Sequence, residues 1–305
     1  MNTRVTLPGT SLELKNPILT ASGTFGYGVE YAPYGDLTSL GGIVVKGLSL
    51  QPREGNPSPR IAETPCGMLN AVGLQNSGVE AFLAEKLPKL PTAELPVIAN
   101  LYACDPSEFA ELTSVLAKEE GIAAIEVNIS CPNVAEGGIL FGQEAKLAAG
   151  VTEAVKNAAG DKPVIIKLSP NVTNITTIAK AVEGAGADII SCINTLSGMA
   201  VDVWSRKPLL ANVIGGLSGP AIKPVALRCT YQVCQAVDIP VIGIGGITSA
   251  EDILEFMLVG AHAVQIGTAN FLRPDFSFRL VNELEALMQK MGIEDLEEFR
   301  GTLRV

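Results

Sequence analysis

Short apolar runs alternate with helical patterns along most of the chain. The apolar runs are typical of buried strands and cover residues 17–23, 42–47, 96–100, 124–130, 163–168, 188–195, 240–246 and 263–268. Amphipathic periodicity predicts helices over residues 106–118, 143–158, 175–184, 220–236, 249–259 and 276–291. Asp105 is the expected N-cap of the first helix, because Pro106 suits the first helical position. Strands that are apolar throughout are typical of a parallel sheet buried on both faces.

Eight such strands, most of them followed by a helix, predict an α/β fold of the (β/α)8 TIM-barrel type, in one domain that spans residues 1–305. An open doubly wound sheet explains the pattern less well. A dinucleotide-binding fingerprint that began at Gly243 would need its third glycine at position 248, where the chain has Thr248.

Two segments interrupt the alternation. Residues 49–77 are rich in Pro, Gly and Asn and are predicted to form a long loop or hairpin over the mouth of the barrel. Residues 196–219, which contain the single tryptophan Trp204, are predicted to form a long loop.

Composition narrows the possible functions. The 305 residues are 47% hydrophobic and 18% charged, and the net charge of −10 argues against nucleic-acid or anionic-membrane partners, which need clustered Lys and Arg. No run approaches the length of a membrane span, so we expect a soluble, cytoplasmic protein. The six cysteines contain no CxxC pair, which indicates reduced thiols and argues against an iron–sulfur or zinc site in this chain. The single histidine, His262, precedes the last strand and is predicted to be structural, which excludes Ser-His-Asp triads.

The stretch 126–133 ends an apolar strand at Pro132, so its polar residues lie where the strand stops. Cys131 is presented there between the carboxamides of Asn128 and Asn133. One interpretation makes Cys131 a small hydrophobic residue at a strand end, and the other makes it a base or nucleophile at a cleft. The glycines that follow, Gly137, Gly138 and Gly142, predict a mobile loop able to close over a ligand.

Polar residues also end other predicted strands, and the strand ends of a barrel meet at one mouth. These residues are Ser22, Lys46, Asn100, Asn128, Lys167, Asn194 and Thr195. The last two strands end in Gly245-Gly246 and Gly267-Thr268, which predicts a phosphate site and hence a phosphorylated cofactor. Lys46 and Lys167 have no acidic neighbour in sequence. They are either solvated charges or cations that stabilise the negative charge of a reduced flavin.

At this point the sequence resembles a known family. The motifs at residues 45–47, 68–76, 128–133, 193–195 and 243–246 are similar to those of class 1 dihydroorotate dehydrogenases, FMN-containing barrel enzymes of pyrimidine synthesis, and the resemblance covers essentially the whole chain. Residues 22–28 and 134–142 resemble the NAD-linked class 1B catalytic subunit more than the fumarate-using class 1A enzyme. The resemblance implies oxidation of (S)-dihydroorotate to orotate on the route to UMP. It also implies one FMN per chain and a homodimer within a heterotetramer, whose partner subunit carries FAD and a 2Fe–2S cluster and passes electrons to NAD+.

The resemblance also implies roles for individual residues. Cys131 is expected to remove a proton from C5 of dihydroorotate while a hydride passes from C6 to N5 of FMN. The expected substrate-binding residues are Lys46, Asn70, Ala71, Val72, Gly73, Leu74, Asn128, Asn133, Asn194 and Thr195. The expected FMN-binding residues are Ser22, Lys46, Gly47, Asn100, Asn128, Lys167, Ile193, Gly219, Gly245, Gly246, Gly267 and Thr268, and no metal site is expected.

Other functions stay open from the sequence. They are a class 1A enzyme, a dihydropyrimidine dehydrogenase-type flavoenzyme that reduces uracil or thymine, and a non-catalytic flavin-binding scaffold for a redox partner. A tRNA dihydrouridine synthase is a further barrel flavoenzyme with a cysteine, but it needs a basic RNA-binding surface, which the net charge argues against.

Overall fold

The computed structural model describes residues 1–130 and 141–305. Eight parallel strands form a closed barrel in the order β10-β15-β16-β3-β4-β7-β8-β9, which confirms the predicted (β/α)8 architecture. They are β3 (Ile18–Thr20), β4 (Gly42–Val44), β7 (Val97–Leu101), β8 (Ala124–Asn128), β9 (Val164–Leu168), β10 (Ile189–Cys192), β15 (Val241–Ile244) and β16 (Ala263–Ile266). Each lies where an apolar run predicted a strand.

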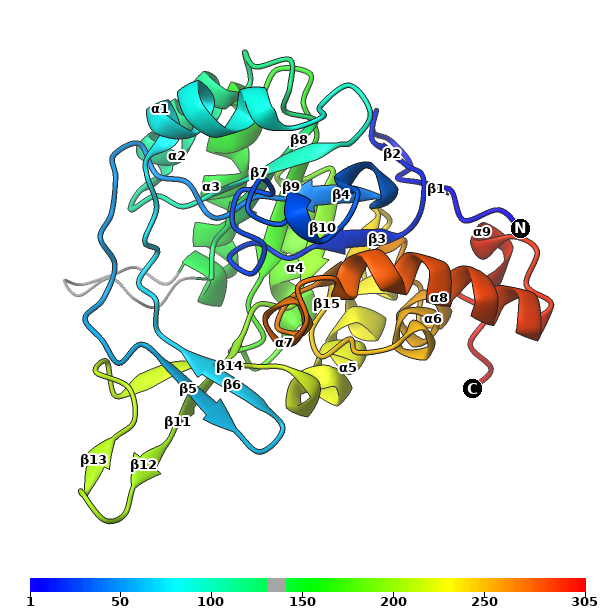
Figure 1. Cartoon of the computed structure of the whole chain (residues 1–305). Coiled ribbons are helices and arrows are strands. Elements are labelled where there is room, and N and C mark those ends of the chain that lie inside the picture. Colours follow the sequence, from blue (N-terminus) through cyan, green and yellow to red (C-terminus); the bar gives the residue numbers. More distant parts are fainter. Residues whose placement is uncertain (131–140) are drawn as a thin grey trace.

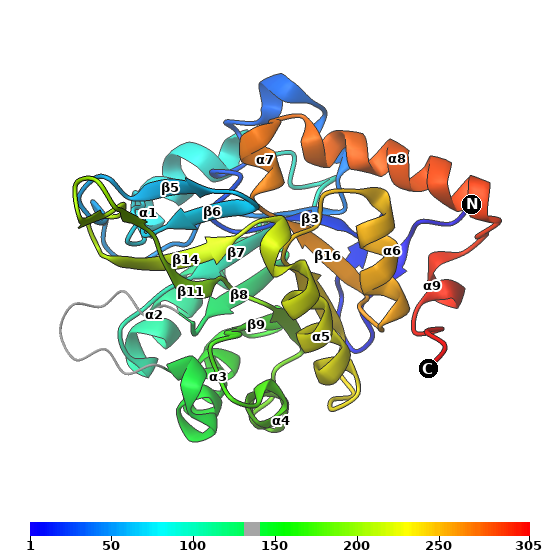
Figure 2. The ribbon, with the colours of Figure 1, turned by 90° about the horizontal axis from the view of Figure 1, so that it is seen from below.

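Helices surround this barrel (Figures 1 and 2). All six predicted helices are present, as α2 (Pro106–Leu116), α3 (Ala145–Ala158), α4 (Ile175–Gly184), α5 (Lys223–Cys234), α6 (Ala250–Leu258) and α8 (Phe276–Met291). The Asp105 side chain accepts hydrogen bonds from the backbone N–H groups of Ser107 and Glu108, which confirms its capping role. Two short helices, α7 (Ala269–Leu272) and α9 (Leu296–Phe299), were not predicted. Neither was the helical segment that precedes β7, which is α1 (Val79–Ala81) followed by a π-helical turn (Phe82–Lys86) and a 3-10 turn (Leu87–Lys89).

A four-stranded antiparallel sheet extends from the barrel (Figure 1). Its order is β11-β14-β6-β5, with β5 (Ile61–Thr64), β6 (Gly67–Asn70), β11 (Leu196–Met199) and β14 (Ile214–Ser218). The hairpin predicted within residues 49–77 is therefore confirmed, but the loop predicted for residues 196–219 is wrong. That segment supplies β11 and β14, and between them a hairpin of β12 (Val201–Asp202) and β13 (Lys207–Pro208). Glycines, which are uncommon inside strands, made this segment look like a loop in the sequence. Gly215 and Gly216 are required by packing, because a Cβ would come within 2.6 Å of Asn70 O and 2.1 Å of Thr195 Oγ1.

The inside of the barrel is closed at one end only. A two-stranded hairpin, β1 (Val5–Thr6) and β2 (Glu13–Leu14), packs its apolar side chains against the lowest layer of residues inside the barrel. Residues of that layer include Ile98, Ala124, Ile165, Ile189 and Ala263. Both chain termini also lie away from the small antiparallel sheet (Figure 1). Among the described residues, the interior of the barrel is therefore accessible from the opposite end, where the strands have their carboxyl ends. No helix in the described part of the chain is long and apolar enough to cross a membrane.

Candidate active site

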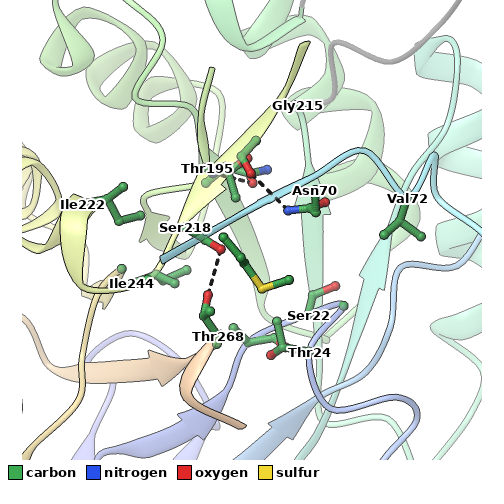
Figure 3. A pocket seen from close by; sticks show the side chains of 18 of the residues that line it. Ser22, Thr24, Asn70, Val72, Thr195, Gly215, Ser218, Ile222, Ile244 and Thr268 are labelled. Atoms are coloured by element: carbon green, nitrogen blue, oxygen red, sulfur yellow. Dashed lines mark hydrogen bonds between the residues drawn. The ribbon is translucent and has the colours of Figure 1, made fainter. Parts of the chain in front are cut away.

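A cavity of about 620 Å³ lies at the carboxyl ends of the barrel strands, between these ends and the small antiparallel sheet. Figure 3 shows that Ser22 and Thr268 face it from the barrel, while Asn70 and Gly215 face it from the sheet. The sheet therefore covers the mouth of the barrel and turns an open end into an enclosed site.

The structure brings most of the predicted site residues to this one cavity. Those on its wall are Ser22, Lys46, Gly47, Asn70, Val72, Gly73, Leu74, Asn100, Asn128, Lys167, Ile193, Asn194, Thr195, Gly219, Gly245, Gly246, Gly267 and Thr268. Ala71 is absent from the wall, because its side chain is buried in a separate apolar cluster with Leu69 and Leu210, neither of which lines the cavity. The prediction that Ala71 contacts substrate could therefore hold only through its backbone.

Cys131 and Asn133 lie outside the described residues, as do Gly137 and Gly138 of the predicted mobile loop. Their neighbours are informative. Ser130, which directly precedes Cys131 in the chain, lies on the cavity wall. Gly142, in a 3-10 turn (Phe141–Gln143), donates its N–H to the carbonyl of Ile129 at 2.9 Å. The chain therefore leaves and returns at the same place, beside the cavity.

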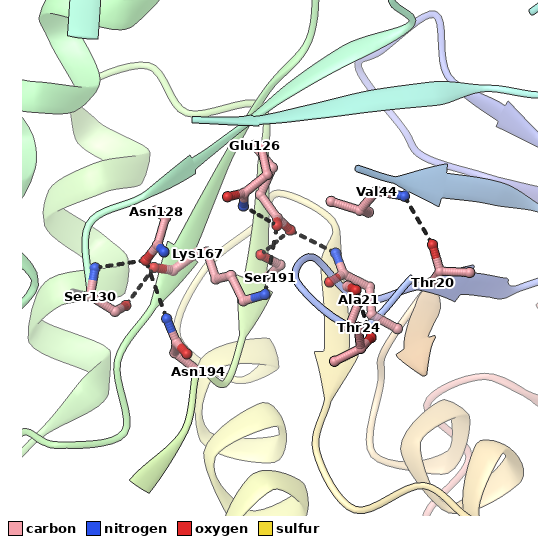
Figure 4. A network of polar contacts seen from close by, with 12 residues as sticks. Thr20, Ala21, Thr24, Val44, Glu126, Asn128, Ser130, Lys167, Ser191 and Asn194 are labelled. Atoms are coloured by element: carbon pink, nitrogen blue, oxygen red, sulfur yellow. Dashed lines mark hydrogen bonds and ion pairs between the residues drawn. The ribbon is translucent and has the colours of Figure 1, made fainter. Parts of the chain in front are cut away.

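The carboxamides at the strand ends hold one another in place (Figure 4). Asn128 Oδ1 accepts hydrogen bonds from the backbone N–H of Ser130 at 3.1 Å and from Asn194 Nδ2 at 3.2 Å. Ser130 Oγ donates to the Lys167 carbonyl at 3.0 Å, and the backbone N–H of Thr195 donates to Asn194 Oδ1 at 2.7 Å. Both hydrogen bonds of the Asn128 side chain with described residues use its oxygen, so its NH2 group is the part that can donate to a ligand.

Lys46 brings to the cavity a positive charge that has no ion-pair partner among the described residues. Burial, and to a smaller extent the positive charge of Arg60, lowers the pKa of the Lys46 ammonium below its ordinary value. None of the ion pairs formed by described residues includes Lys46. An anionic ligand at Lys46 would therefore relieve an unfavourable burial of charge.

A layer of buried polar side chains forms the floor below Asn128. Glu126, with 0% of its surface exposed, lies 3.7 Å from Lys167 Nζ and accepts hydrogen bonds from three other side chains (Figure 4). These are Asn100 at 2.7 Å, Ser191 at 2.9 Å and Gln265 at 2.6 Å. Lys167 thus has an acidic partner, although none is near it in sequence. Glu126, Ser191 and Gln265 were not predicted as site residues.

The signal that would have found this layer is the period of two along a strand. Each polar side chain comes two residues after an apolar residue of the lowest barrel layer, and so points inward like it. The pairs are Ile98 and Asn100, Ala124 and Glu126, Ile165 and Lys167, Ile189 and Ser191, and Ala263 and Gln265.

Comparison with known proteins identifies the family. The sequence model described as dihydroorotate dehydrogenase matches residues 4–288. The chain belongs to the dihydroorotate dehydrogenase family. Three similar proteins carry the name dihydroorotate dehydrogenase B (NAD(+)), catalytic subunit. The one from Solidesulfovibrio magneticus is 70% identical over 305 residues, which cover 100% of this chain and 99% of its own. The protein from Maridesulfovibrio salexigens is 67% identical over 99% of both chains, and that from Geotalea daltonii is 56% identical over 96% of both.

Two features of this dihydroorotate dehydrogenase-family cavity fit a flavin mononucleotide. Asn100 Oδ1 is buried without a hydrogen-bond partner among the described residues, and an acceptor of this kind suits a ring N–H of a flavin. The glycines after β15 and β16 lie on the cavity wall, where their backbone N–H groups suit a phosphate. Gly245 and Gly246 have φ of +129° and +74°, and a Cβ on either would come within 2.8 Å of α5, so only glycine fits at these two positions. Because β15 and β16 pair directly, their terminal loops lie side by side.

Further residues on the cavity wall escaped the sequence analysis. Asn171 donates from Nδ2 to the Thr195 carbonyl at 3.0 Å and accepts from the backbone N–H of Ser197 at 2.9 Å, so it joins β11 to the loop after β9. Ser218 shares a 2.8 Å hydrogen bond with Thr268 and connects the sheet to the predicted phosphate site (Figure 3). No local pattern marks either residue, because each acts across a gap in the sequence.

Proposed function

We propose that this chain is the catalytic subunit of an NAD-linked dihydroorotate dehydrogenase, which oxidises (S)-dihydroorotate to orotate on the route to UMP. One observation carries the proposal: carboxamides, and a lysine that forms no ion pair with the described residues, converge on a single cavity, as a planar polar ring with a carboxylate requires. The names of the similar proteins support the same activity and the same acceptor. We further propose that residues 1–305 form one FMN-binding domain.

The substrate side of the cavity is the wall shared by the sheet and the loop after β10. Lys46 would bind the carboxylate of dihydroorotate, and the amides of Asn70, Asn128 and Asn194 would donate to and accept from its ring edges. Thr195, residues 72–74 and, beyond the described residues, Asn133 would complete the contacts. The hydrogen bond between Asn194 and Asn128, the one from the Thr195 backbone to Asn194 and the one from Asn70 to the Gly216 carbonyl keep these amides oriented before substrate binds.

The FMN would lie on the floor of the cavity. Lys167 and Asn100 would contact the pyrimidine part of its ring, with Ser22, Gly47 and Ile193 along the sides. Gly219, Gly245, Gly246, Gly267 and Thr268 would hold the phosphate through their backbone. When bound, FMN accepts the hydride that leaves C6 of dihydroorotate.

Cys131 would act as the base. Its thiolate takes the proton from C5, and the electron pair of the C5–H bond becomes the second bond between C5 and C6 as the hydride departs. The position of Ser130 on the cavity wall supports this role, because Cys131 is the next residue in the chain. Deprotonation at C5 and hydride loss at C6 together balance the two-electron oxidation.

The electrons would leave through a partner subunit. We propose that it carries FAD and a 2Fe–2S cluster, that it reduces NAD+, and that two copies of each subunit form a cytoplasmic heterotetramer around a homodimer of this chain. The words "catalytic subunit" in the names of the similar proteins support the existence of a partner.

The test is an anaerobic titration of the purified chain, with FMN bound, while the yellow flavin absorbance is followed. Bleaching by dihydroorotate and not by dihydrouracil is the expected result. Bleaching by dihydrouracil alone would instead indicate a dihydropyrimidine dehydrogenase-type enzyme, and a bound flavin that neither compound reduces would indicate a scaffold. Rapid reoxidation of the bleached chain by fumarate would contradict the NAD-linked assignment.

A further inference from the structure

Glu126 is a buried charge that the proposed chemistry does not use. It lies on β8 with 0% exposure, and it is not on the cavity wall. Two of its partners, Asn100 and Lys167, are on that wall. Of the ion pairs formed by described residues, Glu126–Lys167 is the most deeply buried, with 7% of the lysine side chain and 0% of the glutamate side chain exposed. Glu126 can therefore reach a ligand only through its neighbours.

The carboxylate is surrounded by donors. Oε1 accepts from Asn100 Nδ2 at 2.7 Å and faces Lys167 Nζ at 3.7 Å. Oε2 accepts from Gln265 Nε2 at 2.6 Å and from Ser191 Oγ at 2.9 Å. These partners come from β7, β9, β10 and β16, so one carboxylate ties four strands together below the cavity.

Glu126 also decides which atoms its neighbours present to the cavity. Because the NH2 groups of Asn100 and Gln265 both point at the carboxylate, their carbonyl oxygens are turned away from it. Both oxygens are buried without a hydrogen-bond partner among the described residues. Glu126 thereby makes Asn100 an acceptor at the cavity floor and holds the ammonium group of Lys167 beside it.

We propose that Glu126 is a positioning residue that keeps the reduction potential of the bound flavin low. This inference rests on the proposed function. A flavin ring gains negative charge on reduction, so Lys167 alone would favour the reduced form. The fixed negative charge of Glu126 opposes this effect, and in a water-excluded interior the opposition is strong. A low potential suits an enzyme that must pass its electrons to a nicotinamide, which is a weak oxidant.

The experiment compares the FMN-loaded wild type with Glu126→Gln by equilibration with redox dyes. Removal of the charge is expected to raise the midpoint potential, with reduction favoured by about tenfold, or about 30 mV for a two-electron couple. By linkage, the Kd ratio of oxidised to reduced FMN must rise by the same tenfold. Glutamine can be accommodated here, because Ser191 and Gln265 can rotate to offer an acceptor to its NH2 group.

Two further variants separate charge from packing. Glu126→Asp keeps the negative charge but moves it one methylene farther from Lys167, so the midpoint potential of its flavin should rise less than in Glu126→Gln. If Glu126→Gln does not retain FMN, Glu126→Asp replaces it in the experiment, and its midpoint potential is still expected to rise. Asp188→Asn is the matched control, since it removes one negative charge from a pair with Lys156 at the opposite ends of the strands. It should lower thermal stability and leave the potential unchanged.

An unchanged or lower potential in the folded Glu126 variants would overturn the proposal, as would an equal rise in Asp188→Asn. If the wild type is bleached by dihydroorotate and only these potentials disagree, the proposed function stands and the role of Glu126 falls. A wild-type protein that binds no FMN would overturn both.

Discussion

Gly216 controls the space beside two predicted substrate-binding residues. It lies in β14, where it pairs with Ser197 on one side and Asn70 on the other, and its carbonyl accepts a hydrogen bond from Asn70 Nδ2 at 3.3 Å. A Cβ on Gly216 would be 2.1 Å from Thr195 Oγ1 and 2.7 Å from Thr195 Cβ. Gly216→Ala therefore pushes directly against the substrate side of the cavity.

The size of the effect follows from these distances. Rotation of the Thr195 side chain can move Oγ1, but its Cβ stays in place at 2.7 Å, roughly 0.8 Å short of the ~3.5 Å that carbon atoms prefer. The backbone of Thr195 or of β14 must therefore shift. Displacements near 1 Å in a positioned site cost about 10²-fold in rate, or about 2.7 kcal/mol of transition-state stabilisation. We expect kcat/KM for dihydroorotate to fall by about that factor.

The assay combines steady-state kinetics with the FMN content of the purified protein. FMN content should stay normal, because Thr195 and Asn70 are on the substrate side. Gly150→Ala is the matched control: Gly150 is an exposed residue of α3 with nothing within 4 Å of an added Cβ. It should leave kcat/KM unchanged and stabilise the helix by roughly 0.5–1 kcal/mol. If kcat/KM of Gly216→Ala stays within twofold of wild type, Thr195 and Asn70 do not position the substrate.

Three further predictions address the base, the cofactor lysine and the histidine. Cys131→Ala or Cys131→Ser should retain FMN but lose about 10²–10⁴-fold in turnover at neutral pH, and near-normal turnover in the alanine variant would rule out this base. Lys167→Ala should weaken FMN retention, because it removes a cation from the cavity and leaves the buried Glu126 without its ion-pair partner; unchanged FMN content after gel filtration would contradict the cofactor assignment. Burial lowers the pKa of His262 from 6.5 to about 4. Between these pH values the unfolded chain binds more protons than the folded chain, so the free energy of unfolding rises with pH, by at most about 3 kcal/mol. The difference in unfolding free energy between wild type and His262→Asn should therefore shrink between pH 7 and pH 4, and an equal difference at both would exclude this linkage.

Much of the architecture was predictable because its determinants are local. Residues 163–168 are apolar except for Lys167 and form the buried strand β9, while residues 175–184 carry a helical period, follow the capping Asn174 and form α4. A barrel adds a geometric rule, since its strands end at one mouth. For that reason Lys46, Asn128 and Asn194, which are far apart in the sequence, could be placed together in advance, and the structure puts all three on one cavity wall.

What the sequence alone did not determine depends on register between distant segments. The register of β8 and β9 sets Asn128 beside Lys167 and Glu126 beside Ile165, and only this alignment brings the Glu126 carboxylate to the Lys167 ammonium. The pairing of β14 with β6 likewise turned a glycine-rich segment into the sheet that covers the cavity. In both cases the partners are chosen by backbone hydrogen bonds and by the packing of side chains from other elements. The period of two along each strand shows that these polar side chains point inward, but it does not record which of them meet. The tertiary structure therefore decided the contacts within the polar floor and the cover of this site.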